Sequence, residues 1–450
     1  MTCIIESPAL LVEWRQLHDR IRSYQKAIAP QRKLPVEILA EVFQYCVTPD
    51  PQVLLYRPFT PELELVCSKW RRVALRTPIL WTEVYVDYGN RSDRYHLVSK
   101  LAKERLSRSG NCLVSLTIKG GDQSFKTRHA APDIVSKLVL PNAHRLRSLS
   151  VHATEALLLP FLTSTPPSIG SLQSIALSIS GRSRLADDIA FFSRAVNLRH
   201  VTVLATSHLP LFRFPWAQLT DLHLSTSIHP DVALPLLRKC ALLVRCKLHL
   251  GITGARTGDE RSDNVVLENL LSLAIHLPNL EGVPYGQLIR SLILPRLDSF
   301  SVVYPHPTAP MNWTWQTTFL PIITLSNSVE TLELSMKVLP GDIDFLFESI
   351  PSLVTVHLRG GDALAVGTLE KMSRGEILPK LEILSCHVVD RMDLFLDMLE
   401  WRWINRCPNP CTILRYAGIY ATPRAFTLNS RTRVDSLKNQ GMVIILPRKS

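Results

Sequence analysis

The chain has 450 residues, of which 46% are hydrophobic and 20% are charged. This balance excludes an intrinsically disordered chain and leaves enough residues for more than one folded module. No run of about 18 uninterrupted apolar residues occurs, so the sequence predicts no membrane span. The net charge of +12 would suit an acidic partner or nucleic acid, but the basic residues form no dense run, which argues against nucleic acid.

The cysteines and the N-terminus indicate the compartment. The nine cysteines are odd in number and lie scattered within apolar patterns, which favours buried thiols over a disulfide framework. The first residues have neither a basic start nor a small-residue cleavage site, so we expect no secretory signal. We therefore expect a protein of the cytoplasm, the nucleus or both.

The first predicted element is a helix in the N-terminal segment, residues 1–29, which ends before Pro30. Its apolar residues alternate spacings of four and three, as in the seam between two packed helices. They are Leu10, Trp14, Leu17, Ile21, Tyr24 and Ile28. Two hypotheses explain the seam: the helix folds back onto the next module, or it makes a dimer contact.

The most informative stretch of the chain is residues 34–43. Pro35 suits the first turn of a helix, where its missing N–H costs nothing, and Glu37 suits the positive N-terminal end. The spacing of the apolar residues predicts one stripe along this helix. A second apolar cluster follows in residues 66–81, with the sequence Val-Cys-Ser-Lys-Trp-Arg-Arg-Val-Ala-Leu, and then Thr-Pro-Ile-Leu-Trp.

In order, these pieces resemble the F-box: Leu-Pro-x-Glu-Ile-Leu, a Phe, Val-Cys-x-x-Trp-Arg-x-Val-Ala, and Thr-Pro-x-Leu-Trp. The resemblance implies a small all-α F-box module over residues 30–85 that docks on the Skp-family adaptor of SCF-type ubiquitin ligases. The positions that match the motif as adaptor contacts are Leu34, Pro35, Ile38, Leu39, Val42 and Phe43. We expect docking and the core of the module to share Val66, Trp70 and Trp81.

A linker over residues 86–112 leads from the F-box into a repeated pattern. A short strand is predicted at residues 83–87, where the linker begins, and a helix at residues 93–107 within the linker. From residue 113 onward the chain repeats apolar-x-x-apolar-x-apolar, which is typical of a short strand. Most units begin about 20 to 29 residues after the previous one, the length of a leucine-rich repeat. The units begin at Leu113, Leu146, Leu172, Leu198, Leu219, Leu243, Leu270, Leu297, Val329, Leu353 and Leu381.

Helical spacing appears between these predicted strands. The predicted return helices cover residues 186–192, 231–240, 342–350 and 391–404. Strand and helix in alternation predict an α/β leucine-rich-repeat solenoid with a curved parallel sheet, because neighbouring units must stack to bury their apolar faces. The chain as a whole is then α+β, with the solenoid and its C-terminal cap over residues 113–446 and a tail at 447–450.

The concave face of such a solenoid is lined by the strand positions between the apolar residues, and it is where we expect a substrate to bind. His223 and His357 lie within repeat strands and are candidate substrate contacts. Trp313 and Trp315 lie in an inserted loop and are further candidates, because tryptophan is enriched in binding hot spots. The alternatives are that the histidines are merely solvated and that the loop folds its tryptophans onto the solenoid.

The sequence contains no recognisable motif for catalysis. No phosphate-binding loop, dinucleotide fingerprint, His-Glu-x-x-His or nucleophile elbow occurs, so we expect no catalytic residue and no cofactor. Cys407 and Cys411 are close in sequence, but a zinc site needs about four ligands and no second pair stands nearby. We therefore expect no metal site and interpret the two thiols as ordinary turn residues.

The F-box and the degenerate repeats together resemble the large F-box families of basidiomycete fungi. The resemblance implies a non-catalytic substrate-receptor subunit of an SCF-type (cullin–RING) ubiquitin ligase. The adaptor would link the chain to the cullin, and the repeats would capture a protein substrate whose identity the sequence does not give. The alternative is a scaffold that uses the F-box and the repeats without ubiquitin transfer.

Overall fold

The structure is a computed structural model that divides into two compact units, Met1–Pro160 and Phe161–Ser450. The residues that it describes are 8–28, 34–46, 60–89, 95–120, 135–154, 168–180, 190–205, 212–251, 264–277, 285–304, 328–338, 340–360, 364–388, 391–404, 407–420 and 427–446. Helices and parallel strands both occur, which confirms the predicted mixture of α and β structure. None of the described helices has the combination of length and hydrophobicity that crossing a bilayer requires.

The first unit begins with the predicted helices. Its first helical elements are α1 (Pro8–Ile28), α2 (Val36–Cys46), α3 (Thr60–Val66), α4 (Ser68–Leu75), the 3₁₀ turn η2 (Pro78–Trp81) and α5 (Tyr95–Arg108). The four seam residues of α1 whose side chains are described are exposed: Trp14, Leu17, Ile21 and Tyr24. The fold-back and the dimer contact therefore both remain hypotheses.

A parallel sheet follows the helices of the first unit. Its strands are β1 (Glu83–Gly89), β2 (Val114–Gly120) and β3 (Leu146–Thr154), and β2 pairs with both others. The buried Arg145, at the end of the 3₁₀ turn η5 (Leu140–Arg145), joins this sheet to the end of α5. Its guanidinium donates to the Leu106 carbonyl at 2.7 Å, to the Ser109 hydroxyl at 2.8 Å and to the Gly110 carbonyl. Gly110 has a φ of 54°, which ends α5 where the sequence predicted.

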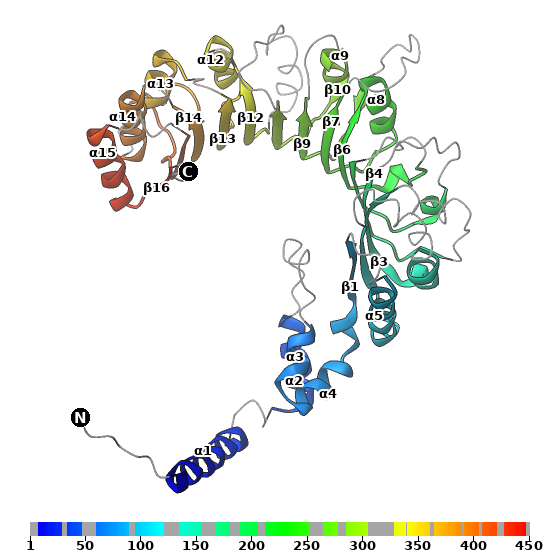
Figure 1. The fold of residues 1–450 in the computed structure, drawn as a ribbon. Coiled ribbons are helices and arrows are strands. Elements are labelled where there is room, and N and C mark those ends of the chain that lie inside the picture. Colours follow the sequence, from blue (N-terminus) through cyan, green and yellow to red (C-terminus); the bar gives the residue numbers. More distant parts are fainter. Residues whose placement is uncertain are drawn as a thin grey trace, which may run out of the picture. The chain divides into compact units, whose positions relative to one another are not determined.

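Parallel strands in chain order form the sheet of the second unit, where they lie side by side (Figure 1). They are β4 (Ser174–Ser180), β5 (His200–Ala205), β6 (Asp221–Ile228), β7 (Arg245–Leu250), β9 (Ser272–His276), β11 (Ser299–Val303), β12 (Thr331–Lys337), β13 (Thr355–Gly360), β14 (Ile383–His387), β15 (Tyr416–Tyr420) and β16 (Val443–Ile445). Each of these strands lies where the repeated pattern or the predicted cap places one. The pattern did not reveal the short pair β8 (Val265–Val266) and β10 (Leu292–Ile293).

The register of these strands aligns the same repeat position from one unit to the next. The middle apolar residues are Cα partners in succession and are buried, from Ile175 through Val201, Leu222, Cys246, Leu273, Phe300, Leu332, Val356 and Leu384. The parallel strands thus align their buried apolar residues in one row across the sheet.

Helices cover one side of this sheet in the second unit (Figure 1). They are α8 (Pro230–Arg238), α9 (Tyr285–Arg290), α12 (Pro340–Ser349), α13 (Val366–Ser373), α14 (Met392–Trp403) and α15 (Leu428–Asn439). Three of the four predicted return helices are confirmed as α8, α12 and α14. In the fourth, residues 186–189 lie outside the described residues, and the 3₁₀ turn η7 (Phe191–Arg194) forms at its end.

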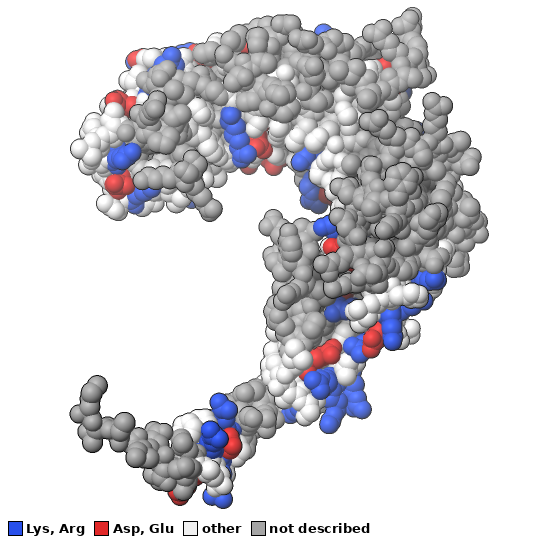
Figure 2. Space-filling view, in the orientation of Figure 1, with Lys and Arg blue, Asp and Glu red and all other residues white. Residues whose placement is uncertain are grey.

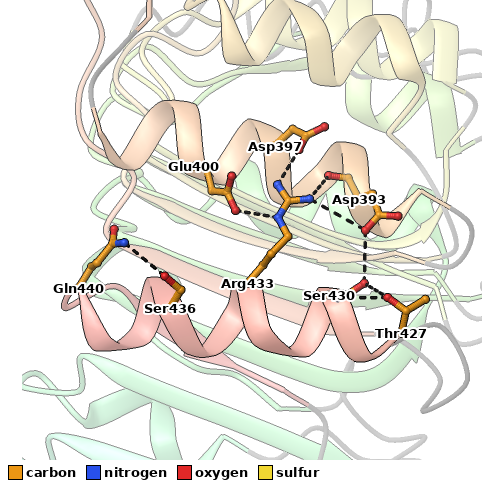
Figure 3. Close-up of polar contacts among 8 residues, drawn as sticks. All are labelled: Asp393, Asp397, Glu400, Thr427, Ser430, Arg433, Ser436 and Gln440. Atoms are coloured by element: carbon orange, nitrogen blue, oxygen red, sulfur yellow. Dashed lines mark hydrogen bonds and ion pairs between the residues drawn. The ribbon is translucent and has the colours of Figure 1, made fainter.

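The last two helices are joined by a cluster of ion pairs (Figure 3). Arg433 on α15 donates to Glu400 at 2.8 Å and to Asp397 at 2.5 Å, both on α14. The hydrogen bond to Glu400, followed by that to Asp397, holds the pKa of Arg433 above its usual range. Thr427 caps α15 by accepting from the Ser430 N–H at 3.1 Å.

Candidate functional site

The helical module, formed by α2, α3, α4 and η2, has a small core of its own. Its buried residues are Leu39, Phe43, Leu63, Val73, Ala74, Leu80 and Trp81. The rings of Phe43 and Trp70 are 4.9 Å apart at their centroids, so the first and second apolar clusters of the sequence pack directly. The indole of Trp81 donates to the Ala74 carbonyl at 2.9 Å, which satisfies its polar group inside the core.

The local sequence explains why α4 begins where it does. Cys67 has an extended backbone and stands at the N-cap position, where its sulfur accepts from the Trp70 N–H at 3.5 Å. This capping role replaces the Ser, Thr, Asp or Asn that more often satisfies the first N–H groups of a helix. It fixes the start of α4 and thereby turns Trp70 toward Phe43.

Only part of the predicted apolar stripe on α2 is available at the surface. Ile38 is 44% exposed and Val42 is 43% exposed, one helical turn apart on the same side of α2. Pro35 and, on α3, Val66 are also exposed. An exposed apolar pair of this kind is what a protein contact would cover.

The other part of the predicted stripe faces inward. Leu39 and Phe43 are 0% exposed, because they form the core of the helical module. Leu34 and Trp70 are half-buried against that core, and Trp81 lies within it. These residues can support a docking surface, but Leu39 and Phe43 do not form its outer layer in this structure.

Sequence reasoning also missed several exposed apolar residues of the same module. They are Val36, Tyr45, Leu65, Leu75 and Ile79. For the residues on α2, the available signal was the number of apolar residues, which is too large for one stripe of a small amphipathic helix. Residues 38 and 42 form one i, i+4 row and residues 39 and 43 the next, and burial of one row leaves the other outside.

The second candidate surface is the open face of the sheet in the second unit. We use this name for the side whose side chains are half-buried and alternate with fully buried ones, as on β6, β7, β9 and β11. The central row of this face follows the strand register through Thr202, His223, Lys247, Ala274, Ser301, Glu333, His357 and Ser385.

The two predicted histidines therefore share one row but occupy different surroundings. His223 lies beside Lys247, with its ring nitrogen Nε2 2.8 Å from the Ser225 hydroxyl. His357 pairs with Glu333, whose carboxylate faces Arg359 at 3.5 Å. Burial lowers the pKa of His357, while Glu333 acts in the opposite direction. The structure separates the two imidazoles by β7, β9, β11 and β12, so they do not form one site.

The remaining predicted sites are the two tryptophans of the inserted loop and the two neighbouring cysteines. Trp313 and Trp315 lie outside the described residues. Cys407 and Cys411 are half-buried and not joined by a disulfide, and burial together with a hydrogen bond to Cys411 raises the pKa of Cys407 to about 11. Within the described ranges, no group of three or more His, Cys, Asp or Glu side chains could hold a metal ion.

Charge on the second unit is mixed in sign. Where described residues of this unit are visible in Figure 2, blue and red side chains lie close together over its last helices and on the inner side of its strands. Interspersed charges of this kind suit a protein surface better than the long basic stripe that tracks a nucleic-acid backbone.

Comparison with known proteins adds no further assignment. No protein-family model matches the chain, and no curated protein matches its sequence.

Proposed function

We propose that the chain is the substrate-receptor subunit of an SCF-type (cullin–RING) ubiquitin ligase. In this proposal the helical module is an F-box that docks on a Skp-family adaptor. The second unit is a leucine-rich-repeat solenoid whose open face captures a protein substrate. The chain itself is not an enzyme: it acts by raising the local concentration of substrate near the conjugating subunits.

One observation carries the adaptor contact. Ile38 and Val42 belong to the F-box-like motif and are exposed side by side, while the neighbouring row holds the module together. Since the core is complete without Ile38 and Val42, stability of the module does not require these residues to be apolar. A partner surface supplies the reason, because large exposed apolar residues that cluster mark contact sites.

Binding to the purified Skp-family adaptor tests this proposal. The double substitution Ile38→Asp with Val42→Asp should weaken the affinity, measured by calorimetry, by about a hundredfold or more, since a central interface residue contributes about 2 kcal/mol. Both side chains are exposed, so the melting temperature should hardly change. Val196→Asp with Leu428→Asp, two exposed apolar residues of the second unit, is the matched control and should bind normally.

Further measurements distinguish the ligase function from the scaffold function. Full-strength adaptor binding by the Ile38 and Val42 variant would contradict the docking surface. The ligase reading further requires that cullin co-purify with the adaptor-bound chain and that ubiquitin be transferred to a bound protein. An adaptor complex that recruits no cullin would instead support the scaffold.

A further inference from the structure

Three neighbouring strands gather basic and polar side chains on the open face of the second unit. His223 on β6 is the Cα partner of Lys247 on β7. One row further along, Ser227 on β6 is the partner of His249, which in turn is the partner of His276 on β9. Residues that are far apart in sequence thus form one continuous patch.

The imidazoles of this patch are held in a defined arrangement. The rings of His249 and His276 stack, with their centroids 4.1 Å apart and their planes 9° from parallel. Nε2 of His249 is inaccessible to solvent and has no hydrogen-bond partner among the described residues. A buried ring nitrogen without a partner costs free energy.

The charges around the patch do not balance within it. The carboxylate on this face of β6 is Asp221, which is engaged by Arg245 on β7 and by His200 on β5, the latter at 2.8 Å. On β9 and β11 the described residues of this face are Ser272, Ala274, Ser299, Ser301 and Val303, none of which ionises. Lys247 is left as the fixed charge beside three imidazoles.

Burial and the positive charge of Lys247 lower the pKa values of the three histidines. Burial, followed by the nearby His249 and Lys247, lowers the pKa of His276 to about 4. Burial and Lys247 also lower the pKa values of His223 and His249. At neutral pH the imidazoles are therefore neutral, and an anion placed beside them would favour their protonated form.

We infer that His223, Lys247, His249 and His276 form a docking site for an extended peptide segment that carries Asp or Glu side chains. This inference rests on the proposed function, because it names the chemistry of the substrate that the open face would capture. A single carboxylate matches the single fixed charge of Lys247. A phosphate dianion would in addition require a proton on one of the imidazoles, since Asp221 already balances Arg245.

Anion binding and proton uptake are coupled at this site. The bound carboxylate raises the pKa of the imidazoles above their values in the unoccupied protein, so the complex holds more protons than the separate partners. Affinity should therefore rise as the pH falls from 8 to 6.

Fluorescence anisotropy with the full chain tests the site directly. The probe is a labelled octapeptide of alternating Ser and Glu, compared with counterparts that carry Gln, Lys or phosphoserine. The Glu peptide should bind at least tenfold more tightly than the Gln peptide, and tighter at pH 6 than at pH 8. Lys247→Gln and His249→Gln should each weaken it by about tenfold. Lys239→Gln, an exposed lysine after α8, should not.

Several outcomes would overturn the inference. They are equal binding of the Glu and Gln peptides, unchanged binding by the Lys247→Gln chain, an affinity that does not depend on pH, or a phosphoserine peptide that binds ten times more tightly than the Glu peptide. The adaptor is absent from these measurements. A chain that binds the Glu peptide but not the adaptor would thus refute the ligase proposal alone, whereas one that binds only the adaptor would refute the peptide site alone.

Discussion

The Lys69 ammonium donates a hydrogen bond of 2.7 Å to the carbonyl oxygen of Leu34. It joins α4 to Leu34, two residues before α2 begins, so the two motif segments of the helical module are tied at their N-terminal ends. The contact is half-buried and charge-assisted, which makes it stronger than an exposed ion pair.

Replacing Lys69 by Met should loosen the helical module. The substitution keeps most of the aliphatic stem but leaves the Leu34 carbonyl without this donor, at a cost of about 1 kcal/mol. Hydrogen exchange of the α2 and α4 amides measures the local loss. Arg72→Met removes a charge from the exposed side of α4 and is the control. Equal effects of the two substitutions would show that the carbonyl contact contributes nothing.

Phe43 and Val42 are adjacent in sequence but should respond oppositely to truncation. Phe43→Ala removes a ring from the core and its contact with Trp70, which should cost about 3 to 5 kcal/mol. Val42→Ala should cost less than about 1 kcal/mol, because the side chain is exposed. Urea unfolding of the two variants gives the comparison. If Val42→Ala proved the more destabilising, the assignment of the two rows of α2 would be reversed.

Arg433 should stabilise the contact between α14 and α15 in a salt-dependent way. Arg433→Gln breaks the pairs with Asp397 and Glu400 and should lower the stability of α15 by about 1 kcal/mol in dilute buffer. In 1 M salt the difference should shrink, since the screening length falls to about 3 Å.

Hydrogen exchange of α15 at both salt concentrations measures this effect. Arg431→Gln, an exposed arginine two residues earlier on the same helix, is the matched control. A loss for Arg433→Gln that is the same at both salt concentrations would mean that its packing, and not its charge, holds the helices together.

The histidines of the open face should make stability fall in mild acid. The pKa values of His223, His249 and His276 are lower in the folded chain than the usual 6.5, so the unfolded chain binds more protons between the two values. Their contribution is complete above pH 6.5 and is lost as the pH falls toward the folded value, about 4 for His276. Thermal unfolding between pH 7.5 and 5 should show this decline.

A variant separates these histidines from the other titrating groups. His276→Gln should reduce the slope of melting temperature against pH over that range, whereas His144→Gln, an exposed histidine of the first unit, should preserve it. A His276→Gln slope as steep as that of the wild type would contradict the role of this histidine.

Much of the secondary structure could be predicted because its signals are local. The repeat strands from Leu146 onward show the apolar spacing that buries one face of a strand, and each was found where expected. The paired strands β8 and β10 are each two residues long, which is too short to show an apolar pattern. The helices α9 and α13 were also missed, and η7 is only a single turn where a helix was predicted.

The sequence by itself determined which segments are apolar and how their apolar residues are spaced, because both properties depend only on side chains that are close together in the chain. It could not decide that Leu39 and Phe43 turn inward while Ile38 and Val42 remain outside, since both rows have the same i, i+4 spacing and only packing against Val73, Leu80 and Trp81 distinguishes them. Nor could it bring His223, Lys247, His249 and His276 together. Their adjacency arises from the register of three parallel strands, which exists only after the chain has folded.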